Sequence, residues 1–302
     1  MLEILCLGTG GSVPSRDRAL PAVAVKRGPD VFLFDCGEGT QRQLMVSPFS
    51  FMHLRAVFIT HLHGDHFYGL PGLLQTMGLM GRTAPLTVAG PAGMAAAVKA
   101  SLETCPGEIP YGISVTELGP GGSVRFNEVT VTAFATVHGV PSVGFCLQED
   151  YGRPAFDREK AAAHGITGRD FAVLEQGGEV NGVTLADVSG PGRKGLSVVY
   201  TGDTAVCDSV CKAAEGTDVL VHEATYMDTE KELAAAHWHS TAKQAAETAK
   251  KAGCGALILV HTSNRYKDRT PLAAEAQAVF RKTFVPDDLT LFNLSRNGLR
   301  PV

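Results

Sequence analysis

Four metal-ligating side chains fall within six consecutive residues, His61-Leu62-His63-Gly64-Asp65-His66. They follow a short apolar run, Ala56 to Ile59, which is typical of a buried strand. Imidazole and carboxylate ligands suit zinc, manganese or iron, and the lack of cysteine in the hexapeptide argues against a closed structural zinc site. Three of the chain's ten histidines are unlikely to meet in one hexapeptide by chance. The sequence therefore predicts a metal-binding loop at the carboxyl end of a strand.

The same arrangement recurs later in the chain. Further apolar runs end in histidine or carboxylate side chains: Val129–Val137 before His138, Leu196–Tyr200 before Asp203, Asp218–Val221 before His222 and Glu223, and Ala256–Val260 before His261. In α/β folds ligands bind at the carboxyl ends of strands, because these ends deliver side chains to a common crevice. Residues 1–148 and 195–302 both alternate strands with helices, so we expect two sheets packed face to face with helices outside.

Two helices are expected near the end of the chain. Ser240 is placed to cap a helix over Thr241–Ala252. Pro271 is favourable in a first helical turn and is expected to open a helix that extends to Phe284. A last strand, Leu289–Leu294, is expected to close the chain.

Between Glu149 and Lys194 the pattern changes, because glycine-rich turns alternate with one helical patch, Arg158–His164. About 45 residues with such weak apolar periodicity indicate an insertion within a compact domain. A disordered linker between two domains is the alternative, but strand-like runs resume directly afterwards. We therefore expect one domain, residues 1–302, with residues 149–194 inserted as a projecting, flexible arm.

Seven candidate ligands are too many for one tetrahedral ion and suit two ions that share a carboxylate. We assign His61, His63 and His138 to the first ion and Asp65, His66 and His261 to the second, with Asp203 between them. Two ions about 3.5–4 Å apart activate a water and stabilise both the attacking and the leaving oxygen of a phosphodiester. The ligand set therefore predicts ester or phosphodiester hydrolysis.

The oxygen that leaves a phosphodiester also needs a proton. His239 lies close in sequence to the later ligands and is the candidate donor, with Glu223 as the group that orients it. Its position equally fits a surface histidine at the start of a helix. His222 is a candidate supporting residue beside the ligands.

The composition of the chain limits which binding partners and which cellular compartment are expected. The hydrophobic content of 44% is that of a globular protein, and the formal net charge of -4 gives no overall electrostatic case for a nucleic-acid partner. Residues 1–9 lack the features of a signal peptide, and no run reaches the ~18 apolar residues of a membrane span. Seven cysteines occur without a Cys-x-x-Cys pair. We expect a reduced, cytoplasmic protein without a membrane partner.

The chain resembles the metallo-β-lactamase superfamily, whose fold is an αββα sandwich. Within it, the chain is similar to the ribonuclease Z family, endonucleases that remove 3′ trailers from tRNA precursors. The resemblance spans nearly the whole chain and rests on Gly8–Gly10, Phe34–Gln41, Ile59–His66, Thr201–Thr204, His222–Thr225, His239–Ala242 and His261–Tyr266.

The resemblance implies two zinc ions, with manganese as an alternative, on the seven ligands assigned above. It implies that Asp65 accepts the proton when a metal-held hydroxide attacks the phosphate, and that His239 protonates the leaving oxygen. The tRNA would keep a 3′-hydroxyl. It also implies a homodimer in which each arm clasps the precursor tRNA bound at the partner's active site.

Two segments depart from the family pattern. The family's Pro-x-Lys-x-Arg-Asn loop is replaced by Pro14-Ser-Arg16-Asp-Arg18-Ala19, and the arm has no Gly-Pro step near its tip. From Tyr151 to Gly195 six basic residues balance six acidic ones, whereas contacts with phosphate favour net positive charge.

Three other functions compete with that of a tRNA endonuclease. The runner-up is a small-molecule phosphodiesterase or arylsulfatase that uses the same metals. A non-enzymatic RNA-binding module is disfavoured, because all seven ligands are present. Flavin-linked di-iron chemistry is disfavoured, because His63 occupies a position where such proteins usually have a carboxylate.

Overall fold

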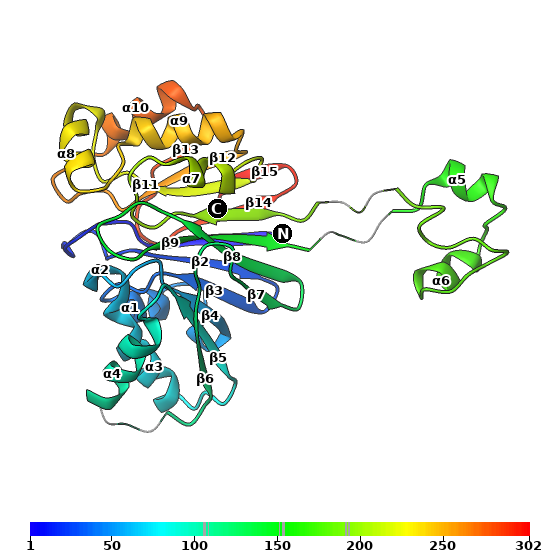
Figure 1. Cartoon of the computed structure of the whole chain (residues 1–302), viewed down its shortest axis with the longest axis horizontal. Coiled ribbons are helices and arrows are strands. Elements are labelled where there is room, and N and C mark those ends of the chain that lie inside the picture. The colour runs from blue at the N-terminus through cyan, green and yellow to red at the C-terminus, as the bar shows by residue number, and fades with distance from the viewer. Residues whose placement is uncertain (105–106, 108, 151, 153–154, 191, 193) are drawn as a thin grey trace.

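Two β-sheets face each other in the computed structural model, with helices on their outer sides and one long projection (Figure 1). The structure describes residues 1–104, 107, 109–150, 152, 155–190, 192 and 194–302. Cys105, Arg153 and Arg193 lie outside the described residues. The predicted αββα arrangement of two mixed sheets is confirmed.

The first sheet has eight strands in the order β15-β14-β1-β2-β3-β4-β5-β6. Pairing is antiparallel from β15 to β3 and parallel from β3 to β6. The strands are β1 Leu2–Gly8, β2 Ala22–Arg27, β3 Asp30–Phe34, β4 Leu54–Phe58, β5 Leu86–Gly90, β6 Ile113–Glu117, β14 Thr290–Ser295 and β15 Gly298–Pro301.

The second sheet has seven strands in the order β13-β12-β11-β10-β9-β8-β7. Pairing is antiparallel from β7 to β10 and parallel from β10 to β13. The strands are β7 Ser123–Phe126, β8 Val129–Ala135, β9 Val143–Glu149, β10 Ser197–Tyr200, β11 Val219–Glu223, β12 Ala256–Val260 and β13 Thr283–Phe284. The sheets therefore do not follow the halves of the chain, because β7–β9 join the second sheet and β14–β15 return to the first.

The helices fall into three groups (Figure 1). On the side of the first sheet are α1 Thr40–Val46, α2 Gly64–Phe67, α3 Gly69–Leu79, α4 Met94–Thr104 and a 3₁₀ turn, Phe51–His53. On the side of the second sheet are α7 Asp208–Ala213, α8 Lys231–Ala236, α9 Ala242–Ala252, α10 Thr270–Val279 and a 3₁₀ turn, Asp228–Glu230. The projection contains α5 Arg158–Ala163 and α6 Asp170–Glu175. Within the described residues, none of these helices has the length and apolar character needed to cross a membrane.

The last predicted helix is too long, because α10 ends at Val279 and not at Phe284. Phe280 is already extended, and the following segment pairs with β12 as β13, with Leu257 opposite Thr283. Tertiary pairing with a neighbouring strand thus overrides the helical pattern of the sequence. The closing strand is also followed by a hairpin partner, β15, which the sequence pattern did not indicate.

The predicted cap of α9 is wrong by one residue. Thr241 accepts the N–H of Gln244 at 3.2 Å, and the Gln244 side chain accepts the N–H of Thr241 at 2.9 Å, which forms a capping box. Ser240 instead donates its hydroxyl to the carbonyl of Thr204 at 2.7 Å. That bond ties the start of α9 to the loop that carries Asp203.

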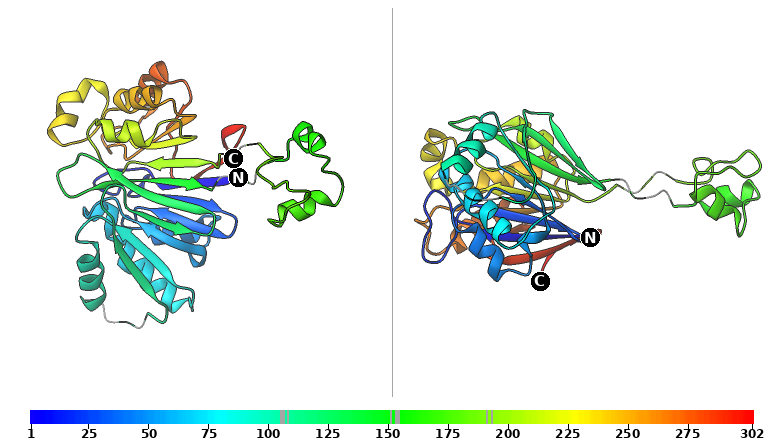
Figure 2. Two further views of the ribbon diagram at one scale, coloured as in Figure 1. Left: turned by 45° about the vertical axis from the view of Figure 1, so that its right-hand side comes forward. Right: turned by 90° about the horizontal axis from the view of Figure 1, so that it is seen from below.

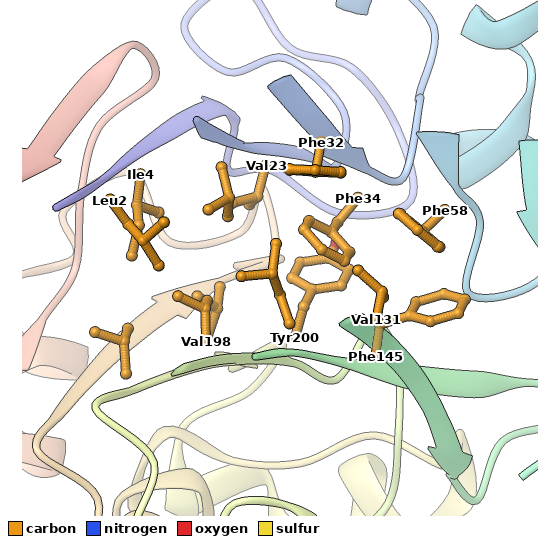
Figure 3. Close-up of a cluster of buried hydrophobic side chains, with 14 of the residues drawn as sticks. Leu2, Ile4, Val23, Phe32, Phe34, Phe58, Val131, Phe145, Val198 and Tyr200 are labelled. Atoms are coloured by element: carbon orange, nitrogen blue, oxygen red, sulfur yellow. The ribbon is translucent and has the colours of Figure 1, made fainter. Parts of the chain in front are cut away.

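The main core lies between the two sheets (Figure 3). Side chains such as Phe34 and Phe58 from the first sheet meet Phe145 and Tyr200 from the second, and the Phe58 and Phe145 rings are 5.2 Å apart. Full burial of one such side chain stabilises the fold by about 1.5–3 kcal/mol. Tyr200 is the polar exception, and its hydroxyl donates to the Asp35 carboxylate at 2.8 Å. The core thus makes direct contact with the polar edge of the sandwich.

Residues 155–190 stand away from the sheets in every view (Figures 1 and 2). This segment, which we call the arm, follows β9 and precedes β10, at the end of the molecule opposite α2 (Figure 1). It has a small apolar cluster of its own, in which Ile166 and Leu174 are buried and the Phe156 and Phe171 rings are 4.6 Å apart. The weakly periodic sequence is therefore sufficient to build a local core.

Candidate metal centre

The seven predicted ligands come from loops that follow strands at one edge of the sandwich. The hexapeptide follows β4, and His138, Asp203 and His261 follow β8, β10 and β12. The structure brings both predicted triads together, since within each the ligand atoms lie within 4.8 Å of one another. The first triad is His61, His63 and His138, and the second is Asp65, His66 and His261.

In the first triad three ring nitrogens face one another. His63 Nδ1 lies 3.0 Å from His61 Nε2 and 3.2 Å from His138 Nε2. The Nδ1 atom of His138 lies 3.2 Å from the carbonyl of Trp238, which can only accept a hydrogen bond, so Nδ1 carries the proton. The Thr60 hydroxyl donates to the Asp35 carboxylate at 3.0 Å, so it accepts the proton of His61 Nδ1, which lies 3.0 Å from it. Both Nε2 atoms are therefore left with lone pairs that point into the centre.

The second triad is oriented by buried oxygens. His66 Nδ1 donates to Asp35 at 2.7 Å, and His261 Nδ1 donates to the Thr225 hydroxyl at 2.8 Å. That hydroxyl in turn donates to Glu223 at 2.6 Å. The Nε2 atoms of the two histidines then lie 3.6 and 3.5 Å from Asp65 Oδ2. Hydrogen bonds of this kind fix the tautomer of a ligating histidine and raise its basicity.

Asp203 lies between the two triads. Its Oδ1 is 3.3 Å from His66 Nε2 and 3.2 Å from His261 Nε2, while its Oδ2 is 3.8 Å from His61 Nε2. One oxygen therefore faces each triad, as a shared carboxylate ligand requires. Burial opposes the charge, but His261 and His66 outweigh it and hold the pKa of Asp203 well below its usual range.

Buried polar atoms without a hydrogen-bond partner show whether these residues are suited to bind metal ions. Among the described residues, buried side-chain atoms without a hydrogen-bond partner include His66 Nε2, Asp203 Oδ1 and His261 Nε2, all in this centre. A buried polar atom left without a partner costs about 1–3 kcal/mol, so such a concentration is unusual. A cation coordinated by these atoms would remove that cost. The donor set of imidazole and carboxylate therefore fits a pair of divalent metals.

His239 stands beside the centre and has the expected contact with Glu223. Its Nδ1 donates to Glu223 Oε1 at 2.8 Å and lies 4.0 Å from Asp203 Oδ2. Burial lowers the pKa of His239, but the Glu223 carboxylate outweighs burial and raises that pKa to about 9. With Nδ1 engaged, Nε2 is the nitrogen left to act on a bound molecule. His222 is buried, and its Nδ1 donates to the Glu223 carbonyl at 2.7 Å.

An open pocket of about 700 Å³ gives access to the centre. Its walls include His63, Asp65, His138 and His239, together with exposed side chains from both halves of the chain. This volume lies within the range of ligand-binding sites. A substrate in the pocket would contact both triads and His239.

The glycine-rich loop at the end of β1, residues 8–11, packs against the ring of His261, one of the predicted metal ligands. A Cβ on Gly11 would lie 2.5 Å from Cε1 of His261, so only glycine fits there. Arg18 is buried behind the same loop and donates to the carbonyls of Thr262 and Ser263 at 3.1 and 3.2 Å. The loop and Arg18 thus support the segment that carries His261.

The residues behind the ligands were not predicted. Asp35 receives hydrogen bonds from the Thr60 N–H at 2.7 Å, from His66 and from Tyr200, although it follows β3 and lies 31 residues before His66. The sequence signal was available, because Asp35 is polar and follows an apolar run, like the ligands themselves. Thr225 gave no comparable signal.

We expect Asp35→Asn to weaken metal binding about 10–100-fold, because His66 loses the carboxylate that fixes its Nδ1 proton. Tyr200→Phe removes one hydrogen bond from the same carboxylate and serves as the milder comparison. Metal affinity, measured by competition with a chelator, should fall further for Asp35→Asn than for Tyr200→Phe, and excess metal should restore activity. Equal affinities in the wild type and Asp35→Asn would contradict this role.

Comparison with known proteins gives a consistent result. A Beta-lactamase superfamily domain model matches residues 31–262. The chain is 41% identical to Ribonuclease Z of Methanosarcina mazei, over 96% of this chain and 97% of the relative. It is 37% identical to Ribonuclease Z of Bacillus licheniformis, over 99% of each. The crystal structure of the short form of human tRNase Z superposes with a TM-score of 0.73 and 28% identity, over 97% of this chain and 99% of that one.

Proposed function

Because the chain belongs to the ribonuclease Z family of the metallo-β-lactamase superfamily, we propose that it is an endoribonuclease that removes 3′ trailers from tRNA precursors. The observation that carries this proposal at the site is the pair of triads on either side of Asp203, with His239 beside them. The test is to map the cleavage position on one precursor tRNA. We expect a tRNA that ends in a 3′-hydroxyl and a trailer that begins with a 5′-phosphate.

We further propose that two zinc ions bind each chain. His61, His63 and His138 would hold the first ion, Asp65, His66 and His261 the second, and Asp203 would ligate both. When bound, the ions would lower the pKa of a water and neutralise charge on the phosphodiester. Manganese accepts the same ligands, so metal analysis of the purified protein and reconstitution of the chelated protein with each ion decide between them.

Two side chains would move protons during hydrolysis. The Asp65 carboxylate, anchored by the N–H of Ser12 at 2.8 Å, would accept the proton of the attacking water. The new bond joins the water oxygen to phosphorus, and the bond from phosphorus to the 3′ oxygen breaks. His239 Nε2 would donate a proton to that leaving oxygen, because Glu223 keeps the ring charged through Nδ1.

The alternative function is hydrolysis of small phosphodiesters or sulfate esters. The crystal structure of a diphosphatase from the PhnP family has a similar fold, with a TM-score of 0.64 at 14% identity, so the fold alone does not identify the substrate. Comparing kcat/KM for a precursor tRNA with that for bis(p-nitrophenyl) phosphate separates the two functions. Efficient cleavage of the small ester without cleavage of the precursor would favour the alternative.

We propose that the arm, inserted into a single domain of residues 1–302, holds the precursor tRNA away from the metal centre. Exposed basic side chains, Arg158, Lys160 and Arg169, are available on it for phosphates. The N–H of Gly190 donates to the carbonyl of Ala155 at 3.1 Å, so the two ends of the arm lie together. A short linker between these two residues can therefore replace residues 156–189 without disturbing β9 or β10.

Removing the arm in this way is expected to lower kcat/KM for precursor tRNA by about 10²–10⁴-fold, because a second binding site on the same ligand is lost. Cleavage of bis(p-nitrophenyl) phosphate should change less than about twofold, since the triads are untouched. Steady-state kinetics on both substrates make the comparison. An equal loss on both would mean that the arm supports the fold and not the tRNA.

We propose that the protein is a homodimer. Large apolar side chains are exposed at the ends of two neighbouring helices, α1 and α3: Met45, Val46, Leu79 and Met80. The two helices lie against each other, because the Gly69 N–H bonds the Cys36 carbonyl shortly before α1, and Gln41 in α1 bonds Thr76 in α3. We propose that a second copy of the chain covers these apolar side chains. Light scattering of the purified chain tests the proposal.

The cytoplasm is the compartment that we propose. The six cysteines in the described part of the chain are free thiols, as is usual in a reducing compartment. Precursor tRNA, the proposed substrate, would meet the enzyme there.

A further inference from the structure

Trp238 is the chain's only tryptophan, and it lies in the wall of the pocket. The side chain is 49% exposed, next in sequence to His239 and in contact with the loop of His138. Its backbone φ is +52°, in the left-handed region that bulky residues rarely adopt. A large apolar side chain in a strained conformation beside a reaction centre requires an explanation.

The backbone conformation explains only part of this position. It directs the Trp238 carbonyl to His138 Nδ1 at 3.2 Å, which orients that ligand. The contact uses no side-chain atom, so glycine or asparagine would provide it with less strain. The indole itself must therefore serve another purpose.

The indole is held at one edge and open elsewhere. A Cβ on Gly139 would lie 3.1 Å from two carbons of the ring, so the glycine allows the indole to lie close against the His138 loop. The ring shares the pocket with His63, Asp65 and His239. Tyr68, which is 69% exposed, lines the same pocket from the other half of the chain. The approach to the metal centre is therefore lined by aromatic surface that remains accessible.

We propose that the Trp238 indole stacks on the nucleobase of a nucleotide next to the scissile phosphate. The inference rests on the proposed function, since it requires single-stranded RNA in the pocket. Unpaired bases stack on aromatic side chains whatever their identity, and the stack fixes the position of the attached phosphate. An apolar contact of this kind is also consistent with a chain of net charge -4, which offers no general attraction for phosphates.

The test compares Trp238→Asn with Trp238→Phe on precursor tRNA. Asparagine tolerates the left-handed backbone and so preserves the carbonyl contact with His138, whereas phenylalanine preserves the aromatic surface. We expect Trp238→Asn to raise KM about 5- to 150-fold with a smaller change in kcat, and Trp238→Phe to stay within a few-fold of the wild type. Metal content should be equal in all three proteins.

Tryptophan fluorescence gives a second readout, because Trp238 is its only source. Precursor tRNA added to the chelated wild type should quench the emission, and a precursor with abasic nucleotides on both sides of the cleavage position should quench it less. An unchanged KM in Trp238→Asn, or emission unaffected by bound precursor, would overturn the stacking while leaving the nuclease function in place. Failure of the wild type to cleave any precursor would remove both proposals.

Discussion

Asp203→Ala is expected to lower kcat/KM for precursor tRNA by about 10³-fold or more. The carboxylate presents Oδ1 to His66 and His261 and Oδ2 to His61, so its removal takes one ligand from each proposed metal position. Metal ions stabilise the charge of a transition state by several kcal/mol, and each 1.36 kcal/mol corresponds to a tenfold change in rate. Metal content per chain, measured on the same preparation, should fall together with activity.

Asp208→Ala is the matched control for this variant. Asp208 lies five residues farther along the chain, where its side chain is 83% exposed and pairs with Lys251 at 3.2 Å. A surface ion pair of this kind contributes about 0–1 kcal/mol, so the control should keep its metal and its activity. If Asp203→Ala kept two metals per chain and full activity, the proposed arrangement of ligands would be wrong.

His239→Ala is expected to lower cleavage of precursor tRNA by about 10²–10⁴-fold, the usual contribution of a general acid. The leaving 3′ oxygen is strongly basic and needs the proton that His239 would supply. The p-nitrophenolate that leaves bis(p-nitrophenyl) phosphate is weakly basic and does not need it. The variant should therefore cleave the small ester at close to the wild-type rate, and kcat measured on both substrates shows the difference.

His237→Ala is the control, because His237 lines the same pocket two residues earlier. It should leave both reactions within a few-fold of the wild type. Equal losses on the two substrates in His239→Ala would show that His239 acts by holding Asp203 or the metals and not by donating a proton. Glu223→Gln should reproduce part of the His239→Ala effect on the precursor, since the ring would lose its 2.8 Å carboxylate partner.

The ligands could be predicted from sequence because their signal is local. Four of the seven side chains lie in one hexapeptide, and His138, Asp203 and His261 each follow an apolar run within a few residues. The rule that ligands gather at the carboxyl ends of strands then brings them together without knowledge of the strand order.

The contacts made by the supporting residues could not be predicted in the same way. Asp35 contacts Tyr200 across the two sheets, 165 residues apart, and Thr225 reaches His261 from a neighbouring loop. The first contact depends on how the two sheets face each other and the second on the strand order within one sheet, and both are properties of the whole fold. Trp238 could not be predicted for a related reason, because its left-handed backbone and its exposure are properties of the folded chain.

The overall sandwich followed from alternating strands and helices, but the strand order did not. Strands β7–β9 and β14–β15 leave the sheet of their own half of the chain, and nothing in their apolar pattern distinguishes one sheet from the other. The sequence pattern predicts helix for the short strand β13, because helix propensity does not reflect its pairing with β12.

The pairing of β1 with β14 has a consequence for the newly made chain. Leu2 lies opposite Leu294, and the loop after β1 is held by Asp288, which accepts the Thr9 N–H at 2.9 Å. During synthesis β1 therefore gains this neighbour only after the whole segment from β2 to β14 has been made. The same loop packs against the His261 ring through Gly11. The position of His261 therefore depends on a strand pairing that forms late in synthesis, and we expect RNA cleavage to require a chain that includes β14.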